Sequence, residues 1–296
     1  MSIPSHSCAQ KSRLTRPALR YHGGKWKLAP WIIAHMPPHR IYVELFGGGG
    51  SVLLRKPRSY AEIYNDRWET VVNVFRVLRD EGTAERLREQ LRLTPFARSE
   101  FEDCGEDSVA AVSDPVERAR RTILRSFAGF GSAAANAKYA TGFRANSHRS
   151  GTTAAHDWAN FPDHIECFVE RLRGVCIESR DALEIIPQQD GADTLFYADP
   201  PYVHSTRNMK RGNAAYEFEM LDADHAALSL ALHQVRGMVL LSGYACDLYC
   251  DLYQDWHSVT MNTFANSAKA AKEILWINPA ALERTAGLFR EGAGAR

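Results

Sequence analysis

The stretch "IYVELFGGGGSVLL", residues 41–54, decides the fold class of this chain. An apolar run typical of a short strand leads into four consecutive glycines, and the residues after them can begin a helix. The next run, "YAEIYND" (60–66), is again strand-like, and "WETVVNVFRVLRDEG" (68–82) repeats apolar residues at helical spacing up to Gly82, where we expect that helix to close. Strands and helices that alternate in this way favour a parallel sheet flanked by helices.

The alternation extends to both sides of this stretch but is interrupted in the middle of the chain. "KLAPWIIAHMP" (27–37) predicts an earlier helix that stops at Pro37. Between Pro95 and about Phe161 no alternation is visible. It returns in the predicted elements "VCIESRDALEII" (175–186), "DTLFYA" (193–198), the helix "DADHAALSLALHQVRG" (222–237), "MVLLSGYACDLYCDLY" (238–253), and an antiparallel pair of "HSVTMNTFA" (257–265) and "KEILWINP" (272–279). We therefore predict one α/β sheet interrupted by an insertion.

The composition is that of an ordinary globular protein, with 45% hydrophobic and 24% charged residues among 296 and a formal net charge of +1. No apolar run approaches the roughly 18 residues that a membrane-spanning helix needs, and the polar start lacks the apolar core of a signal peptide. The six cysteines show no C-x2-C spacing, so no zinc site is predicted. We expect a cytoplasmic protein that does not contact a membrane.

Positive charge is concentrated in the predicted insertion. From Arg118 through Arg149 the chain has seven Lys or Arg residues and no acid, whereas the preceding "SEFEDCGEDS" (99–108) is acidic. A segment of one charge sign inside a nearly neutral protein favours a surface that binds a polyanion. The alternative is a solvated helix face followed by a flexible loop.

The glycine run "ELFGGGGS" (44–51) allows a ligand to approach bare backbone at a helix start. A dinucleotide-binding G-x-G-x-x-G pattern fails, because the sixth position counted from Gly47 is Val52, and no G-x-x-x-x-G-K motif is present. The glycine run can therefore bind a nucleoside-like cofactor, or it can form a tight turn without a ligand. Asp66 ends the next strand, where its carboxylate can accept hydrogen bonds from ribose hydroxyls or can cap a turn. Asp181 can likewise accept a hydrogen bond from an adenine amino group or can cap the helix that follows it.

Two further motifs carry polar groups. "YHGGKWKL" (21–28) places two glycines beside Lys25, which together suit a carboxylate ligand. In "FYADPPYVHS" (196–205) an apolar run ends in an acid, two prolines and a tyrosine, which by itself is also typical of a turn that ends a strand. The basic stretch "HSTRNMKRGNAAYEFEM" (204–220) that follows predicts either a mobile loop closing over a substrate or an ordinary surface loop.

The order of these elements, GGK, FGGGG, basic segment and DPPY, resembles that of the Dam-type DNA adenine N6-methyltransferases (D12 class, alpha group), and in particular phage-like members. The resemblance runs from about Leu19 to Pro279 and implies a Rossmann-like sheet that binds S-adenosylmethionine, with an inserted target-recognition domain. It divides the chain into a cofactor-binding part (19–92), a DNA-binding insertion (93–170), a catalytic part (171–285) and flexible tails (1–18 and 286–296).

The resemblance also implies roles for single residues. Tyr21 falls on the family's cofactor-binding aromatic position, where Dam itself has Trp, and we expect binding to survive because a ring is kept. The implied cofactor-binding residues are Tyr21, Gly23, Gly24, Lys25, Glu44, Phe46, Gly47, Gly48, Gly49, Asp66, Asp181 and Asp199. The implied catalytic residues are Asp199, Pro200, Pro201 and Tyr202. No metal is required, because the sulfonium of the cofactor already activates the leaving group.

The tetrapeptide suits methylation of an amine. Asp199 and the carbonyl of Pro200 can accept the two N–H bonds of the adenine amine, and the prolines hold both acceptors rigidly. Tyr202 offers a ring for a base that must first be flipped out of the double-stranded DNA. The expected DNA-binding residues are Arg120, Arg121 and Arg125, assigned to phosphates, Arg144 and Asn146, assigned to bases, and also Lys138 and Arg149.

Other functions remain open at this point. The tetrapeptide also serves RNA adenine and DNA cytosine-N4 methyltransferases, and a non-catalytic DNA-binding protein on the same scaffold is a further alternative. A nicotinamide-dependent oxidoreductase is disfavoured by the failed glycine pattern. The recognition sequence and a partnership with a cognate restriction enzyme are not determined by these motifs.

Overall fold

The computed structural model describes residues 14–131, 141–145, 152–207, 216–264 and 270–293. The chain divides into two compact units. The sheet unit comprises Tyr21–Val72 and Gly174–Arg296, and the helical unit comprises Met1–Arg20 and Asn73–Arg173. The helical unit thus starts earlier in the chain than the insertion predicted from residue 93.

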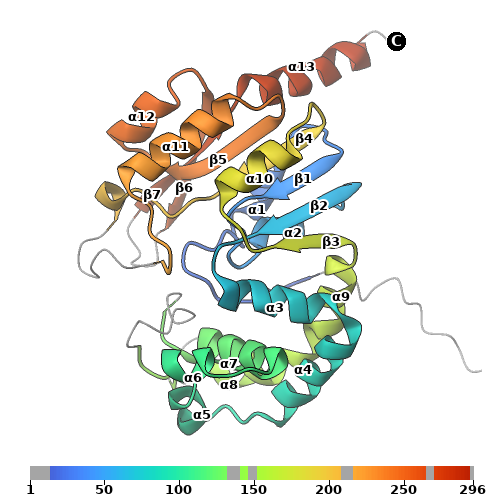
Figure 1. Ribbon diagram of the computed structural model, residues 1–296, viewed down its shortest axis with the longest axis vertical. Coiled ribbons are helices and arrows are strands. Elements are labelled where there is room, and N and C mark those ends of the chain that lie inside the picture. The colour runs from blue at the N-terminus through green and yellow to red at the C-terminus, as the bar shows by residue number, and fades with distance from the viewer. Residues whose placement is uncertain (1–13, 132–140, 146–151, 208–215, 265–269, 294–296) are drawn as a thin grey trace, which may run out of the picture. The chain divides into compact units, whose positions relative to one another are not determined.

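The sheet unit contains a seven-stranded sheet in the order β3-β2-β1-β4-β5-β7-β6 (Figure 1). Its strands are β1 (Ile41–Glu44), β2 (Ala61–Asn65), β3 (Val175–Glu178), β4 (Thr194–Ala198), β5 (Met238–Tyr244), β6 (His257–Phe264) and β7 (Ala270–Ile277). The first five strands pair in parallel, and β7 is antiparallel to both β5 and β6. The predicted α/β class and the final antiparallel pair are confirmed, and the arrangement is consistent with a Rossmann-like methyltransferase fold.

The middle of the sheet is covered on both faces, which explains why β4 and β5 read as continuous apolar runs. Every residue of β4 is buried, as are the first six of β5. On one face, Val43, Phe196 and Val239 pack with α10 (Ala182–Gln189), α11 (Asp222–His233) and α12 (Asp247–Leu252). In Figure 1, α10 and α11 cross in front of the strands. The remaining helices of this unit are α1 (Ala29–Ala34), α2 (Ser51–Arg55), η4 (His204–Thr206) and α13 (Pro279–Ala293).

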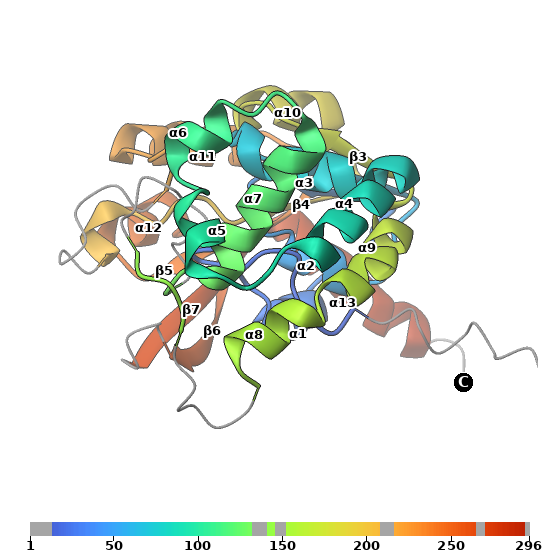
Figure 2. The ribbon, with the colours of Figure 1, turned by 90° about the horizontal axis from the view of Figure 1, so that it is seen from below.

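The helical unit is reached through α3 (Glu69–Arg79) and has an aromatic core. Its other helices are α4 (Glu81–Leu93), α5 (Arg98–Glu102), α6 (Glu106–Ala110), α7 (Pro115–Ala128), α8 (Ala154–Ala159), η3 (Pro162–His164) and α9 (Ile165–Leu172). Helices α4 and α7 lie side by side in both views (Figures 1 and 2). The ring of Phe161 contacts those of Phe127, Trp158 and Phe168, with centroids 4.9, 6.4 and 6.1 Å away.

Two predicted helix ends are wrong, and side-chain capping explains the first of them. Helix α3 ends at Arg79, because the Asp80 carboxylate accepts the backbone N–H of Thr83 at 2.8 Å and starts α4, which places Gly82 inside that helix. Helix α11 ends at His233 rather than Gly237. The backbone N–H of Gly237 instead donates to Asp190 at 3.0 Å.

The predicted tails are shorter than expected within the described residues. Helix α13 continues to Ala293, so residues 286–293 are helical rather than part of a tail. At the other end, Ala18 is fully buried and the Arg16 guanidinium lies 3.1 Å from Asp157. No helix of the described residues has the length and apolar character needed to cross a membrane.

Candidate active site

A pocket of the sheet unit opens where β1, β2 and β4 end, at the carboxyl edge of the parallel strands. Every residue predicted to bind the cofactor lines it: Tyr21, Gly23, Gly24, Lys25, Glu44, Phe46, Gly47, Gly48, Gly49, Asp66, Asp181 and Asp199. Pro201 of the tetrapeptide also lines the pocket. Parallel strands bring motifs that are far apart in sequence to one edge of the sheet, so a single cavity collects them.

The glycine loop after β1 admits no side chains at two of its positions. A Cβ at Gly47 would lie 2.2 Å from the Tyr64 ring, and one at Gly48 would lie 2.7 Å from the Tyr21 ring. Gly48 also has a φ of 48°, which L side chains rarely adopt. The hydroxyl of Tyr64 donates to the Gly48 carbonyl at 2.7 Å, so this ring supports the loop as well as filling the space beside it.

Asp66 anchors the same loop. Its carboxylate accepts the backbone N–H groups of Gly48 and Trp68, each at 2.8 Å. Burial raises the pKa of Asp66, although these two donors oppose the rise. The carboxylate therefore takes the turn-capping role that the sequence left open, and it also faces the pocket where a ribose acceptor is expected.

Asp181 takes the helix-capping role that the sequence left open. Its side chain accepts the backbone N–H of Leu183 at 2.9 Å and so caps α10. It also lines the pocket and lies 3.3 Å from the guanidinium of Arg67. The Arg67 guanidinium in turn lies over the ring of Phe218, 4.8 Å from its centroid, so the ion pair contacts an aromatic side chain.

Lys25 and Asp199 bring the GGK and DPPY motifs into direct contact. The Lys25 ammonium lies 2.8 Å from Asp199 Oδ1 and donates to the Gly23 carbonyl at 2.7 Å. The hydroxyl of Ser242 donates to the same Asp199 oxygen at 2.9 Å. Burial alone lowers the pKa of Lys25, but the charges of Asp199 and Glu273 more than offset it, and the pKa is raised. The ammonium is thus charged and is held against the predicted catalytic acid.

Tyr202 lies next to the Lys25–Asp199 ion pair. Its hydroxyl donates to the buried carboxylate of Glu273, and its ring meets that of Tyr244 at a centroid distance of 4.6 Å with an interplanar angle of 71°. The Lys25 ammonium lies 4.8 Å from the Tyr202 ring centroid. The ring is therefore held from several sides.

Glu44 is a second buried acid of the pocket. It accepts the hydroxyl of Tyr42 at 2.7 Å and the backbone N–H of Leu53 at 2.8 Å. Burial raises the pKa of Glu44 to about 8, although both donors oppose the rise. Glu44 is thus mainly protonated at neutral pH, and it joins β1 to α2 at the edge of the pocket.

Residues 21–266 match the family model of the D12 class N6 adenine-specific DNA methyltransferases. The chain belongs to this family. It is an adenine-specific DNA methyltransferase whose substrate is DNA, and methyltransferases of this type generally use S-adenosylmethionine. A search of the curated proteins finds no match to the chain. Among the described residues of the methyltransferase, no group of three or more His, Cys, Asp or Glu side chains is arranged to hold a metal ion.

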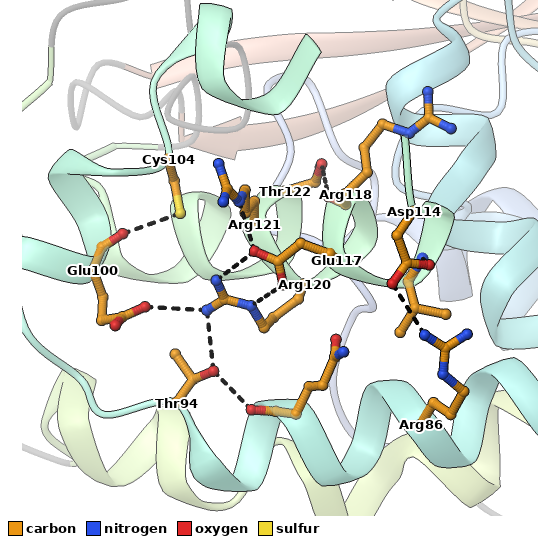
Figure 3. Close-up of polar contacts among 12 residues, drawn as sticks. Arg86, Thr94, Glu100, Cys104, Asp114, Glu117, Arg118, Arg120, Arg121 and Thr122 are labelled. Atoms are coloured by element: carbon orange, nitrogen blue, oxygen red, sulfur yellow. Dashed lines mark hydrogen bonds and ion pairs between the residues drawn. The ribbon is translucent and has the colours of Figure 1, made fainter. Parts of the chain in front are cut away.

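In the helical unit of the methyltransferase, two of the predicted phosphate-binding arginines, Arg120 and Arg121, make internal contacts (Figure 3). Arg120 binds both oxygens of Glu117 at 2.6 and 2.7 Å and also contacts Glu100 and Thr94, each at 3.1 Å. The Arg121 guanidinium donates to Glu117 at 2.7 Å. Glu117, directly before the counted segment, and Glu100 of the acidic flank therefore pair with the first arginines of the basic segment, which the residue count from Arg118 onward does not include.

Arg125 is also directed inward, at 6% exposure, with its guanidinium 3.4 Å from the Cys104 carbonyl. Burial of this kind does not support the expected phosphate contact. Arg144 is half-buried, and its Nη1 donates to the Phe127 carbonyl at 2.9 Å beside the bridge between Gly129 and Phe143. The other predicted DNA-binding residues, Lys138, Asn146 and Arg149, lie outside the described residues, as do residues 208–215 of the stretch 204–220.

The sequence analysis did not identify four residues in or beside the pocket of the methyltransferase. Trp68 and Tyr216 line the pocket, and Ser242 and Glu273 contact the Lys25–Asp199 pair. Trp68 stands two residues after Asp66, at the start of the predicted helical run 68–82. Glu273 was harder to recognise in the sequence. It is an acid at the start of the apolar run of a predicted strand, where burial of an unpaired charge costs free energy of folding.

Proposed function

We propose that the enzyme transfers a methyl group from S-adenosylmethionine to the N6 amine of adenine in duplex DNA, at a specific sequence and on a flipped-out base. The observation that carries this proposal is the contact of Lys25 with Asp199 at 2.8 Å inside the pocket. It joins a predicted cofactor-binding motif to a predicted catalytic motif in one cavity. Membership of the adenine-specific family supports the choice of amine.

The pocket fits S-adenosylmethionine by the chemistry of its walls. The backbone of Gly47 and Gly48 is bare because side chains there would collide with tyrosine rings, so a ligand can approach it closely. We assign Asp66 to the ribose hydroxyls, and Asp181 to the adenine amino group. Tyr21 and Trp68, whose ring centroids lie 6.1 Å apart, supply aromatic surface. When bound, the cofactor supplies a methyl group already activated by the sulfonium.

Asp199 is assigned to the adenine amine. Among the described residues, Lys25 and Ser242 both contact its Oδ1, which leaves Oδ2 to accept an amine N–H. The Pro200 carbonyl is assigned to the second N–H, and acceptance of both localises the nitrogen lone pair toward the methyl group. Because the chain is rigid at the two prolines, little reorganisation is needed before transfer.

Base flipping is proposed because the adenine amine must enter the pocket. The N6 amine of a paired adenine cannot reach a pocket of this kind inside a duplex, and extrusion costs on the order of a few kcal/mol. We assign the ring of Tyr202 to the flipped base. Its position is maintained by the contacts with Glu273 and Tyr244.

Target recognition is assigned to the segment 93–170. Arg144 and Asn146 remain the proposed base readers, and Lys138 and Arg149 remain proposed DNA-binding residues. The ion pairs of Arg120 and Arg121 and the burial of Arg125 make these three arginines weaker candidates. Because the substrate is DNA, we place the enzyme in the cytoplasm. A cognate restriction enzyme would be revealed if cellular DNA were cleaved when the methyltransferase is absent and protected when it is expressed.

The test is methylation with tritium-labelled S-adenosylmethionine, followed by digestion of the nucleic acid and separation of the modified nucleosides. We expect label in N6-methyladenine from duplex DNA, and at a defined sequence when DNA from expressing cells is read. Label in RNA or in N4-methylcytosine, with none in DNA adenine, would overturn the proposal. Calorimetry with unlabelled cofactor checks the binding site independently of transfer.

A further inference from the structure

Glu273 is a buried acid that the proposed chemistry does not yet use. It lies on β7, opposite Tyr244 of the antiparallel neighbour β5, and its side chain is 2% exposed. The Tyr202 hydroxyl donates to Glu273 Oε1, and the Lys25 ammonium lies 3.8 Å from the same oxygen. Glu273 thus contacts two residues of separate motifs that the proposed function brings together.

Around Lys25, two carboxylates face a single ammonium. One ammonium, Lys25, lies between two carboxylates, Asp199 at 2.8 Å and Glu273 at 3.8 Å. Burial raises the pKa of Glu273, Lys25 opposes that rise, and Asp199 adds to it. A buried ammonium needs a compensating anion, since an unpaired charge away from water is strongly destabilising.

The second carboxylate has a consequence for Asp199. If Asp199 were the sole partner of Lys25, its single negative charge would have to serve both the ammonium at Oδ1 and the amine N–H at Oδ2. The reacting amine also becomes positively charged as it accepts the methyl group, and an uncompensated ammonium nearby would oppose that charge. A second carboxylate beside Lys25 reduces both difficulties.

We propose that Glu273 is a positioning residue for methyl transfer: it balances Lys25, so that Asp199 is available to the adenine amine, and it fixes the Tyr202 ring by accepting its hydroxyl. The inference rests on the proposed function and assigns no contact between Glu273 and the substrate. It also changes the expectation for Tyr202, because the hydroxyl and not only the ring is then used.

The chain offers a matched control for a purely structural role. Glu62 on β2 is also buried in the same sheet, at 4% exposure, and pairs with Lys56 at 2.6 Å. Neither Glu62 nor Lys56 lines the pocket. Glu62→Gln therefore removes a buried charge from the same sheet without touching the proposed site.

The experiment compares Glu273→Gln with Glu62→Gln in single-turnover methyl transfer, with calorimetry for cofactor affinity and thermal denaturation for stability. Gln keeps an acceptor for the Tyr202 hydroxyl but removes the charge. We expect Glu273→Gln to slow transfer by at least about tenfold while cofactor affinity changes by less than about threefold. Glu62→Gln should lower the melting temperature without that loss of rate. A rate for Glu273→Gln within about threefold of wild type, or an equal loss in Glu62→Gln, overturns the inference.

A double-mutant cycle with Tyr202→Phe tests the second half of the proposal. Because both substitutions act on one contact, the double variant should lose less than the product of the single losses. Multiplicative losses overturn the link to Tyr202. If Glu273→Gln does not fold, Tyr202→Phe removes the same contact from the other side, and an unchanged transfer rate in that variant overturns the inference. A wild-type enzyme that transfers no methyl group contradicts the proposed function instead.

Discussion

The ammonium of Lys25 lies 2.8 Å from Oδ1 of Asp199, although the two residues belong to opposite parts of the sequence. Lys25 precedes the first strand of the sheet, and Asp199 directly follows β4. The contact places the GGK motif beside the predicted catalytic acid in the pocket. A lysine expected to hold a cofactor carboxylate is therefore also the counter-ion of the acid expected to bind the adenine amine.

Removal of the Asp199 carboxylate should abolish methyl transfer. We expect Asp199→Asn to reduce incorporation of tritiated methyl groups into duplex DNA by at least about 100-fold, because the amide no longer provides an anion for the amine. Asn keeps the size of the side chain, so circular dichroism should show a folded protein. Transfer within about tenfold of wild type would contradict the role of Asp199.

Asp66 should control cofactor affinity through the loop that it holds. Asp66→Ala removes the acceptor of the Gly48 and Trp68 N–H groups, and we expect S-adenosylmethionine binding measured by calorimetry to weaken by about 1.5–3 kcal/mol. The control is Asp80→Ala, which removes a capping aspartate from the helical unit. Equal affinities of both variants would show that the cofactor lies elsewhere.

The glycine at position 48 should be irreplaceable for two separable reasons. Gly48→Ala must adopt a φ of 48° and places a methyl group 2.7 Å from the Tyr21 ring, so we expect weakened cofactor binding and a loss of roughly 1–3 kcal/mol in stability. Gly131→Ala, with a φ of 87° and no atom within 4 Å of the new Cβ, carries the backbone strain alone. Denaturant titration should show the smaller loss for Gly131→Ala, and the reverse order would refute the collision with Tyr21.

Glu44 should make stability fall as the pH rises. Its pKa in the folded protein is about 8, above the ordinary value of 4.5, so the folded state binds more protons between these values. Its contribution is fully present below pH 4.5 and is lost as the pH rises toward 8, at no more than about 1.4 kcal/mol per unit. Glu44→Gln resembles the protonated acid, so its denaturation midpoint should rise relative to wild type between pH 5 and pH 8. A constant difference would contradict the raised pKa.

The arginines of the helical unit should separate into structural and DNA-binding residues. Arg120→Ala removes the contacts with Glu117, Glu100 and Thr94, so we expect a lower melting temperature and an unchanged salt dependence of DNA binding. Arg144→Ala should instead relax the choice of base at one position by about 1–3 kcal/mol. Methylation of single-base-variant duplexes at two salt concentrations distinguishes the two. A flatter salt dependence in Arg120→Ala would restore the phosphate contact first predicted for it.

The sequence by itself determined the fold class and the edge at which the site lies. Strands such as Thr194–Ala198 are recognisable because they are buried on both faces, and parallel strands necessarily bring Gly47, Asp66 and Asp199 to one edge of a sheet. These are local patterns and general rules of topology, and both can be read along the chain.

Only the tertiary structure decided which charges are paired. Whether Arg120 binds phosphate or Glu117, and whether Lys25 faces a ligand or Asp199, depends on distances between side chains that no spacing in the sequence specifies. Glu273 shows this most clearly: its strand was predicted, but its partners Tyr202 and Lys25 come from other elements. The energy of a buried charge depends on its neighbours in space, and folding alone determines which neighbours these are.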